Sequence, residues 1–403
     1  MDPLEIGTGP IRGAYLPSTV ENVLWGRLPC AADEPVLRVE PGDEVTLDTL
    51  SHEGILEDQG RDPDRFFAAY DVPVLADARA LAASDAPHVV GVDGPHVVSR
   101  PIAVAGAQPG DLLAITLLET APRVPYGVVS NRHGRGALPG EYPLEGDVFS
   151  AFARVAEGGM HAEMGLVPGP IGDGPVVRFP MAPFLGILGV AVAGDQRPHS
   201  VPPGAHGGNL DISLLTAGAT LYLPVQVEDA LFYAGDPHFA QGDGEVALTA
   251  LEASLRASVR LDVIPAEEAV AQFGGVVSPL AETVDHLVPT GLDEDLDVAV
   301  QQCVRHAISL LVARYGMDPR MAYAYLSAAT DFEISQVVDV VKGVHARIRK
   351  SDFAGVSPGG RAASASERAA PGGRAASASE RAAPGGRAAP ARGRAAAPWA
   401  GRP

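Results

Sequence analysis

The sequence predicts a mainly β protein of the α+β class, with sandwich-like or barrel-like β modules and a helical element near the carboxyl end. Two observations predict the sheets: short apolar runs alternate with polar residues, and turns rich in Gly and Pro separate them. A third observation predicts the helices, because apolar residues between positions 293 and 344 recur at helical spacing.

The first predicted module, residues 1–180, contains two similar strand–turn–strand units. Residues 35–50 alternate around Pro41-Gly42-Asp43, and residues 101–117 alternate around Pro109-Gly110-Asp111. The repeated turn suggests related β modules, although the same turn is common in unrelated proteins.

Two further segments complete this module. Residues 61–83 show helical spacing of Phe66, Phe67 and Tyr70, which we expect in the core. Residues 118–180 are rich in loop-forming residues. A basic, Gly-rich stretch at 131–136 lacks the Lys-Ser/Thr ending and the following helix of a phosphate-binding loop, so we exclude a nucleotide site there.

The second predicted module, residues 181–353, begins with strands and ends with helices. We expect strands at 184–192 and 219–226 and a mostly β segment at 245–264. The spacing then predicts three helices: residues 293–315, a second from Arg320, and a third from Glu333 to Val344 with Asp331 as its N-cap.

The last predicted segment, residues 354–403, is a low-complexity tail. A 13-residue unit begins at Pro358, occurs again at Pro371 and starts once more at Pro384. Its small and polar residues cannot bury a core, which predicts disorder.

Charge and cysteine content narrow the functional classes. The net charge is −20 although the stretch from residue 355 on has eight Arg and two Glu, so the rest of the chain is more acidic still. Such a surface argues against nucleic acid and anionic membranes as partners. Cys30 and Cys303 form no disulfide framework, and the first residues do not resemble a signal peptide, so we expect a cytoplasmic protein.

Two Gly-rich polar clusters flank the strand predicted at 219–226. Imidazoles and carboxylates at this density suit a divalent metal or an acid–base site, whereas hydrophilic hairpin loops are the simpler alternative. A third polar turn contains His52 and Glu53, and it too could be only a charged turn. The first cluster contains His199, His206, Asn209 and Asp211; the second contains Asp236, His238, Gln241, Asp243 and Glu245.

Three ordered motifs resemble the acetamidase/formamidase family. They are His-Gly-Gly-Asn-Leu-Asp from His206, Leu-Tyr-Leu-Pro-Val from Leu221, and the run from Ala230 to Val246 that contains Gly-Asp-Pro-His-Phe-Ala-Gln-Gly-Asp-Gly-Glu. The segment Asp48-Thr-Leu-Ser-His-Glu-Gly also resembles one branch of the family. The resemblance covers roughly residues 20–353. It implies a β-rich homo-oligomer that hydrolyses small linear amides, often with metal at the site, and it makes His96 a further candidate.

Amide hydrolysis requires a polarised carbonyl group and a strong nucleophile, and a metal can supply both. We therefore expect the two clusters and the His52 turn to converge on one cleft with a divalent ion, zinc first and calcium second. Glu245 is the candidate general base or acid, and Asn209 could hold the carbonyl oxygen or the amide nitrogen. The candidate metal ligands are His52, Asp211, Asp236 and His238.

Alternatives remain at this point. Asp236 and Asp243 could merely cap turns. Residues 1–353 contain no Gly-x-Ser-x-Gly nucleophile motif, and neither cysteine lies in an activating motif. A β protein that binds metal or a small ligand without turnover fits the same residues, as does a hydrolase of the same fold that acts on another amide-like substrate.

Overall fold

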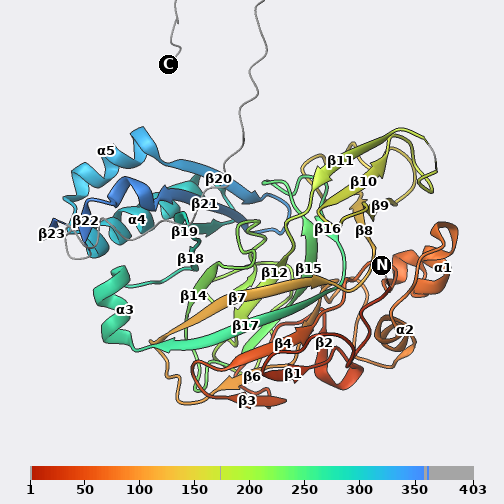
Figure 1. Cartoon of the computed structure of the whole chain (residues 1–403), viewed down its shortest axis with the longest axis horizontal. Coiled ribbons are helices and arrows are strands. Elements are labelled where there is room, and N and C mark those ends of the chain that lie inside the picture. Colours follow the sequence, from red (N-terminus) through yellow and green to blue (C-terminus); the bar gives the residue numbers. More distant parts are fainter. Residues whose placement is uncertain (1, 173, 358–360, 363–403) are drawn as a thin grey trace, which may run out of the picture. The chain divides into compact units, whose positions relative to one another are not determined.

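Two large β-sheets form the body of the computed structural model, which describes residues 2–172, 174–357 and 361–362 (Figure 1). The predicted tail lies outside the described residues except for 354–357 and 361–362. The first sheet has nine strands in the order β1 (Ala14–Leu16), β4 (Glu44–Asp48), β17 (Leu255–Ile264), β7 (Leu112–Pro122), β14 (Thr220–Pro224), β18 (Leu280–Glu282), β19 (His286–Asp293), β21 (Lys342–Arg349) and β20 (Asp331–Gln336).

The second sheet has twelve strands. Eight follow one path: β11 (Val176–Pro180), β10 (His161–Gly165), β9 (Val148–Val155), β8 (Tyr126–Arg132), β16 (Leu251–Glu252), β15 (Phe232–Ala240), β12 (Phe184–Val190) and β13 (Gly207–Asn209). Four short strands extend it beside β15: β2 (Val23–Trp25), β3 (Leu37–Val39), β5 (Val97–Ser99) and β6 (Ile102–Val104). A separate pair consists of β22 (Val356–Ser357) and β23 (Arg361–Ala362).

One apolar core lies between the two large sheets. Leu47, Ile115 and Val259 of the first sheet belong to the same buried cluster as Leu185 and Phe232 of the second. All five side chains are fully buried. The predicted mainly β fold is therefore confirmed, with the two sheets packed face to face as in a sandwich.

The two Pro-Gly-Asp turns connect the sheets. Each carries the chain from a short strand of the second sheet to a longer strand of the first, β3 to β4 and β6 to β7. The short strands pair in parallel, and the long strands flank β17 on its two sides. The two units thus occupy equivalent places in the fold. Because β17 lies beyond residue 180 and both of its neighbours lie before it, the predicted module boundary does not separate the sheets.

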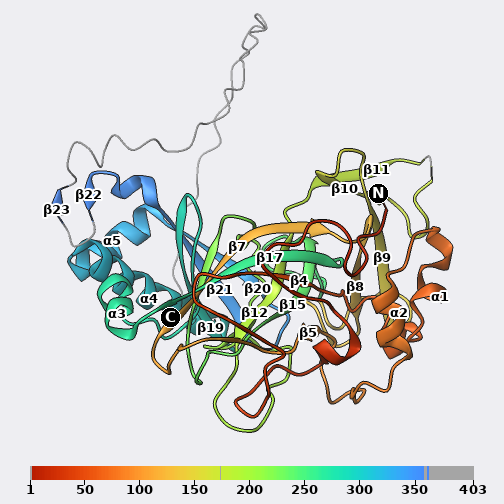
Figure 2. The ribbon, with the colours of Figure 1, turned by 60° about the horizontal axis from the view of Figure 1, so that its bottom comes forward.

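Helices gather near the carboxyl end, as predicted. Figures 1 and 2 show α3 (Ala266–Phe273), α4 (Leu296–Tyr315) and α5 (Pro319–Ala329) beside the strands β18 to β21. Asp295 caps α4 by accepting from the backbone N–H of Asp297 and Val298, and Gly316 ends it in the left-handed conformation. By length and mean hydropathy (1.2) α4 could also cross a membrane. In the fold it packs against β19, β21, α3 and α5.

The segment 61–83 forms two short helices in place of one. These are α1 (Pro63–Phe67), followed by a 3₁₀ turn (Ala68–Tyr70), and α2 (Ala76–Ala83). Asp71 takes a positive φ of 51°, and Pro73 cannot continue a helix, so the chain turns between the 3₁₀ turn and α2. Further 3₁₀ turns are Val20–Asn22, Glu57–Gln59 and Lys350–Phe353.

One expectation was incomplete and another was wrong. The loop-rich segment 118–180 also contains the strands β8 to β11 as an antiparallel run. Residues 333–344 form the β20–β21 hairpin, not a third helix, and Ile334 faces Val344 across it. Asp331 begins β20 and caps no helix. Ile334 and Val344 lie in the two strands, where β-branched side chains suit the pleat better than a helix, whereas residues 337–341 form the turn.

Candidate active site

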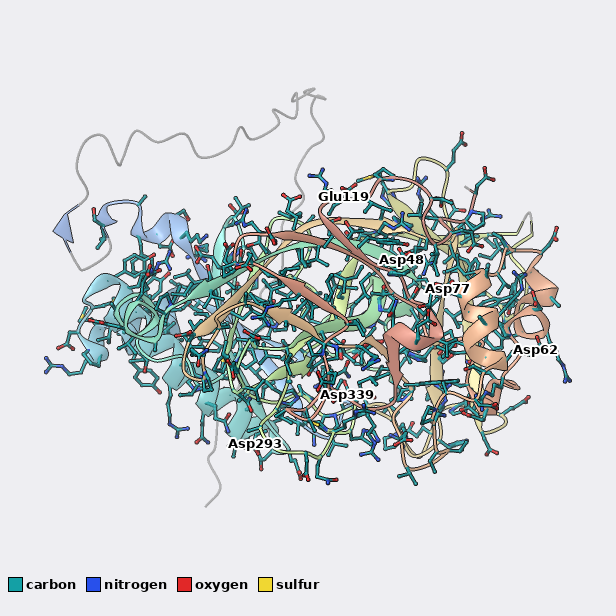
Figure 3. All side chains as sticks on the ribbon, turned by 90° about the horizontal axis from the view of Figure 1, so that it is seen from below. Asp48, Asp62, Asp77, Glu119, Asp293 and Asp339 are labelled. Carbon is teal, nitrogen blue, oxygen red and sulfur yellow. The ribbon has the colours of Figure 1, made fainter. Side chains whose placement is uncertain are left out.

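A cavity of about 220 Å³ lies where loops of both sheets meet. Segments after β4, before β5, after β13 and after β15 contribute to its lining. The turn between β20 and β21 adds Asp339, which Figure 3 labels among the interior side chains. The buried polar residues that line it include His52, His96, Asn209, Asp211, Asp236, Glu245, Glu252 and Asp339. The less buried polar residues Glu57, Asp58, His88, Asp93, Arg132, Arg135 and His199 also line it.

The strand β15 supplies the centre of the site. Asp236 and His238 are two residues apart, so their side chains leave the strand on the same face, and His238 Nε2 lies 3.3 Å from Asp236 Oδ2. Glu252 of β16 is the cross-strand neighbour of His238, and its Oε1 lies 3.0 Å from the same nitrogen. A buried imidazole thus lies between two buried carboxylates.

The turn after β4 brings His52 to this centre. His52 Nδ1 lies 3.8 Å from Asp236 Oδ1 and 3.9 Å from Glu252 Oε2. On its other side, His52 Nε2 is 3.4 Å from Glu53 Oε1. His96, just before β5, places Nε2 3.9 Å from Asp236 Oδ2.

Carboxylates from three other segments close the opposite side. Asp211, after β13, places Oδ1 3.8 Å from His238 Nδ1. Asp211, His238 and Glu245 each offer a donor atom within 4.8 Å of the others. Asp236 belongs to two further groups of this kind, one with His52 and His96 and one with His238 and Glu252. These groups could hold one or more metal ions.

The backbone around the site is unusual. Asp211, Asp236 and Glu245 have positive φ angles of 48°, 53° and 46°. This conformation is costly for non-glycine residues and persists where the surrounding structure enforces it, often at functional sites. Gly186 of β12 leaves the space open: a Cβ there would lie 2.4 Å from Asp211 Oδ1 and 2.6 Å from Asp236 Oδ2.

The pKa values of the imidazoles reflect the surrounding carboxylates. Burial alone would lower the pKa of His238, but Glu252 and Asp236 outweigh burial and raise that pKa well above its usual value. The pKa of His52 is raised in the same way, by Glu53, Glu252 and Asp236 against the effect of burial. Burial dominates at His96 and lowers its pKa to about 4.

Most of the carboxylates have raised pKa values. Burial is the largest cause, and mutual repulsion adds to it. The pKa of Asp211 is raised to about 7, and those of Glu245 and Asp339 are raised well above their usual values. The pKa of Glu252 is raised too. Asp236 and Glu53 are exceptions. The pKa of Asp236 is lowered because His96, His238 and His52 outweigh its burial, and the pKa of Glu53 is lowered because His52, Arg132 and Ser130 outweigh its burial.

Many of these polar atoms have no hydrogen-bond partner within the described chain. Both ring nitrogens of His52 and of His238 are buried without one, and so is the side-chain oxygen of Asn209. The same holds for one oxygen each of Glu53, Asp211, Asp236, Glu252 and Asp339. Buried polar groups are normally satisfied. Imidazole nitrogens and carboxylate oxygens that converge without donors are the ligands that zinc and calcium use, so the site fits a divalent cation.

The structure brings the predicted site residues together. His52, Asn209, Asp211, Asp236 and Glu245 line the same cavity, and His238 contacts Asp236. Their individual roles stay predictions. Of the other polar residues, His199 lines the cavity, Gln241 donates to the Asp211 carbonyl, and Asp243 points to a different cluster.

Sequence reasoning missed Glu252 and Asp339. Glu252 was assigned only to a strand, and Asp339 to a helix that does not exist. The sequence around His238 does not indicate that Glu252 lies beside it, because the pairing of β15 with β16 depends on the register between two strands and not on a local pattern. The Val-Asp-Val context of Asp339 is a weak signal: a charged residue inside an apolar run in a turn.

The two packed sheets and the buried imidazole–carboxylate centre define a β-rich protein with an enzyme-like site. Comparison with known proteins then identifies the group: the model of the Acetamidase/Formamidase family matches residues 78–198 and 191–348, and the chain belongs to this family.

Individual relatives agree with this assignment. A formamidase of Methylophilus methylotrophus is 27% identical over 303 residues, which cover 61% of this chain and 74% of the relative. An acetamidase of Mycolicibacterium smegmatis is 28% identical over 303 residues, covering 58% and 73%. The crystal structure of an acetamidase from Bacillus halodurans has a TM-score of 0.65 at 25% identity, covering 84% of this chain and 98% of that chain.

Proposed function

We propose that this amidohydrolase cleaves the C–N bond of a small linear amide with the help of a divalent metal, zinc first and calcium second. The products are ammonia and a carboxylate. The observation that carries the proposal is the set of buried imidazoles and carboxylates that face one cavity with unpartnered atoms. The relatives named formamidase and acetamidase support the amide as substrate.

In this proposal His52, Asp211, Asp236 and His238 hold the metal, and Glu252 adds a carboxylate beside His238. When bound, the ion polarises the substrate carbonyl and lowers the pKa of water toward neutral. The lowered pKa of Asp236 keeps that ligand in its anionic form. His96 stays neutral at neutral pH because its pKa is about 4, so it adds no charge that would repel a cation.

Glu245 moves the proton. Burial and the nearby Asp211 and Asp339 raise its pKa well above the usual value, so it holds a proton that can pass to the leaving nitrogen. Once deprotonated, the same carboxylate can take a proton from water. Asn209, with its buried side-chain oxygen unpartnered, orients the substrate amide or its carbonyl.

A covalent cysteine mechanism has little support from this site. Both cysteines are buried, and burial raises the pKa of the Cys303 thiol. A thiol in such surroundings is a poor nucleophile. Cys303 lies on α4, and neither cysteine belongs to the residues that line the cavity.

Ammonia release from formamide and acetamide tests the function. We expect the purified chain to release ammonia, to lose activity after treatment with a chelator, and to regain it with zinc. No release from a wide panel of amides by the metal-loaded chain would favour a binding protein. Full turnover without metal would contradict the metal and leave amide hydrolysis intact.

Two further expectations accompany the proposal. We propose a homo-oligomer, supported by exposed apolar side chains around β10 and β11, such as Met160 (68% exposed), Leu166 (61%) and Val167 (76%). Light scattering that gives a monomer would contradict it. We also propose a cytoplasmic location without nucleic-acid or membrane partners, supported by two free cysteines and the net charge of −20.

A further inference from the structure

A second cluster of metal-type side chains lies outside the cavity. Asp243, Glu333 and His345 each offer a donor atom, and these atoms lie within 4.8 Å of one another. Glu333 and His345 are directly opposite each other on β20 and β21. Asp243 comes from the loop after β15, and this loop joins β20 through a bridge between Gly244 and Gln336.

His345 is the buried member of this cluster. Its side chain has no exposed surface, and its Nδ1 forms a 2.8 Å hydrogen bond with Ser335 Oγ. The other nitrogen, Nε2, points to Glu333 and lies 3.3 Å from Oε2, but neither atom has an aligned hydrogen bond. His345 Nε2 and Glu333 Oε2 are thus both buried without a hydrogen-bond partner, although they face each other. Buried polar atoms normally have partners, so this arrangement requires an explanation.

One oxygen atom of Glu333 and one of Asp243 already accept a hydrogen bond. Arg347 Nη1 donates to Glu333 Oε1 at 2.8 Å, and Ser213 Oγ donates to Asp243 Oδ1 at 2.9 Å. These bonds hold the carboxylates in place and leave Glu333 Oε2 free of a donor. Asp243 is exposed, so an ion could enter from solvent and keep water in its shell.

The ionisation states agree with a cation site. Burial and the nearby Glu333 carboxylate raise the pKa of Asp243, as expected where two carboxylates meet without a cation between them. Burial lowers the pKa of His345 to about 4, so its ring is neutral at neutral pH. A neutral imidazole and two carboxylates form a ligand set that zinc uses.

We propose that Asp243, Glu333 and His345 bind a divalent zinc ion that is separate from the amide site and ties the loop after β15 to the β20–β21 hairpin. The role is structural. Asp243 is two residues from Glu245, and Gln241 of the same loop donates to the carbonyl oxygens of Asp211 and Ser335. Fixing Asp243 therefore fixes the backbone that positions Glu245 at the amide site.

Zinc content tests this proposal. The full-length chain is stripped with a chelator, reloaded with Zn²⁺, dialysed and measured by mass spectrometry of the metal. We expect Asp243→Asn and His345→Gln each to hold about one equivalent of zinc less than the unsubstituted chain. Asp243→Asn is the safer variant, because the side chain is exposed and its amide oxygen can still accept from Ser213.

Two further variants separate this site from the amide site. His238→Ala should retain the zinc that Asp243→Asn removes, and the double variant should lack both. The exposed His133, in the loop after β8, serves as a matched control: His133→Gln should leave the zinc content unchanged. These results do not depend on activity, so they stand or fall apart from the proposed amide hydrolysis.

Hydrogen exchange reports the structural role. The backbone N–H of Gly244 and of Val337 bridge the loop and the hairpin, to the carbonyls of Ser335 and Gly244. Zinc should slow their exchange in the unsubstituted chain and not in Asp243→Asn. Equal zinc content in the unsubstituted chain, Asp243→Asn and His345→Gln would overturn the proposal and leave a cluster that merely shares protons.

Discussion

The molecule buries two clusters of charged side chains that differ in how their charges are balanced. In the first, Arg123 Nη1 donates to Asp77 Oδ2 at 2.8 Å, and Arg256 donates to both oxygens of Asp48 at 2.7 and 2.9 Å. Each of these carboxylates therefore has a guanidinium partner inside the fold. Figure 3 labels Asp48 and Asp77 of this cluster and Asp339 of the other.

The second cluster is the amide site, and it lacks such partners. Its six buried carboxylates, Glu53, Asp211, Asp236, Glu245, Glu252 and Asp339, make no ion pair with an Arg or Lys of the described chain. Two imidazoles with raised pKa values, those of His52 and His238, offset part of their charge. The comparison teaches that burial of carboxylates marks a functional site only where the fold does not supply the opposite charge.

The largest effect is expected at the centre of the unbalanced cluster. His238→Ala removes the imidazole that Asp211, Asp236 and Glu252 surround, so the site should lose both its metal and its amidase activity. Metal analysis and ammonia release measure the two losses. Full metal content and turnover in this variant would show that neither metal binding nor catalysis requires His238, and the site assignment would be wrong.

The variant Glu245→Gln tests whether Glu245 transfers a proton or binds the metal. The amide removes the proton transfer but keeps the size of the side chain, so kcat should fall by about 10²- to 10⁴-fold. Metal content should stay unchanged, because the variant leaves all four candidate ligands in place. Loss of metal together with activity would move Glu245 into the ligand set.

Arg123→Met tests the balanced cluster. Removing one member of a buried ion pair leaves an uncompensated charge on Asp77, and this should lower the free energy of unfolding by about 3–5 kcal/mol. Urea denaturation measures the loss.

Asp339→Asn is the matched change in the other cluster. Asp339 has no ion-pair partner among the residues that the structure describes, and an amide in its place would remove repulsion with Asp211. The chelated variant should therefore be no less stable than the chelated parent chain. A similar loss in both variants would erase the distinction between the clusters.

The metal-free site should also make stability depend on pH. Folding raises the pKa of Asp211 to about 7 from about 3.9 in an unfolded chain. The folded state therefore binds more protons between about pH 4 and 7, and the free energy of unfolding should fall as pH rises through that window.

Neighbouring groups mostly shift stability in the same sense. The raised pKa values of Glu245, Asp339, His52 and His238 also favour the folded state at lower pH. His96, with its pKa lowered to about 4, opposes them below pH 6.5, and the lowered pKa values of Glu53 and Asp236 oppose them at still lower pH. Urea denaturation of chelated and zinc-loaded protein at several pH values measures this. A chelated protein as stable at pH 8 as at pH 5 would contradict it.

The sequence allowed the fold class and most of the site to be predicted, because both rest on local patterns. A continuous apolar run identified β12, and the caps Asp318 and Gly316 agree with the predicted helix ends. The motifs from His206 to Glu245 placed the clusters near each other in sequence. His52 joined them through the family resemblance.

The rest depended on long-range pairing. Glu252 reaches the site because β16 pairs with β15, and Asp339 because residues 331–349 form a hairpin. Helical and β spacing both fitted the Val-rich segment there, and only its fit beside β19 decides between them. The sheets also cross the predicted boundary at residue 180, which local patterns cannot show.

The position of β17 has a consequence for how the chain is made. In the sheet, Asp48 of β4 pairs with Arg256 of β17, and Thr116 of β7 pairs with Arg260 of β17. β4 and β7 therefore leave the ribosome well before the strand that lies between them. β17 begins at Leu255, whereas β4 ends at Asp48 and β7 at Pro122, so both strands remain without this neighbour while the intervening residues are synthesised. High contact order of this kind slows folding and exposes unpaired edges to aggregation. We therefore expect the nascent chain to depend on chaperones until residue 264 has emerged.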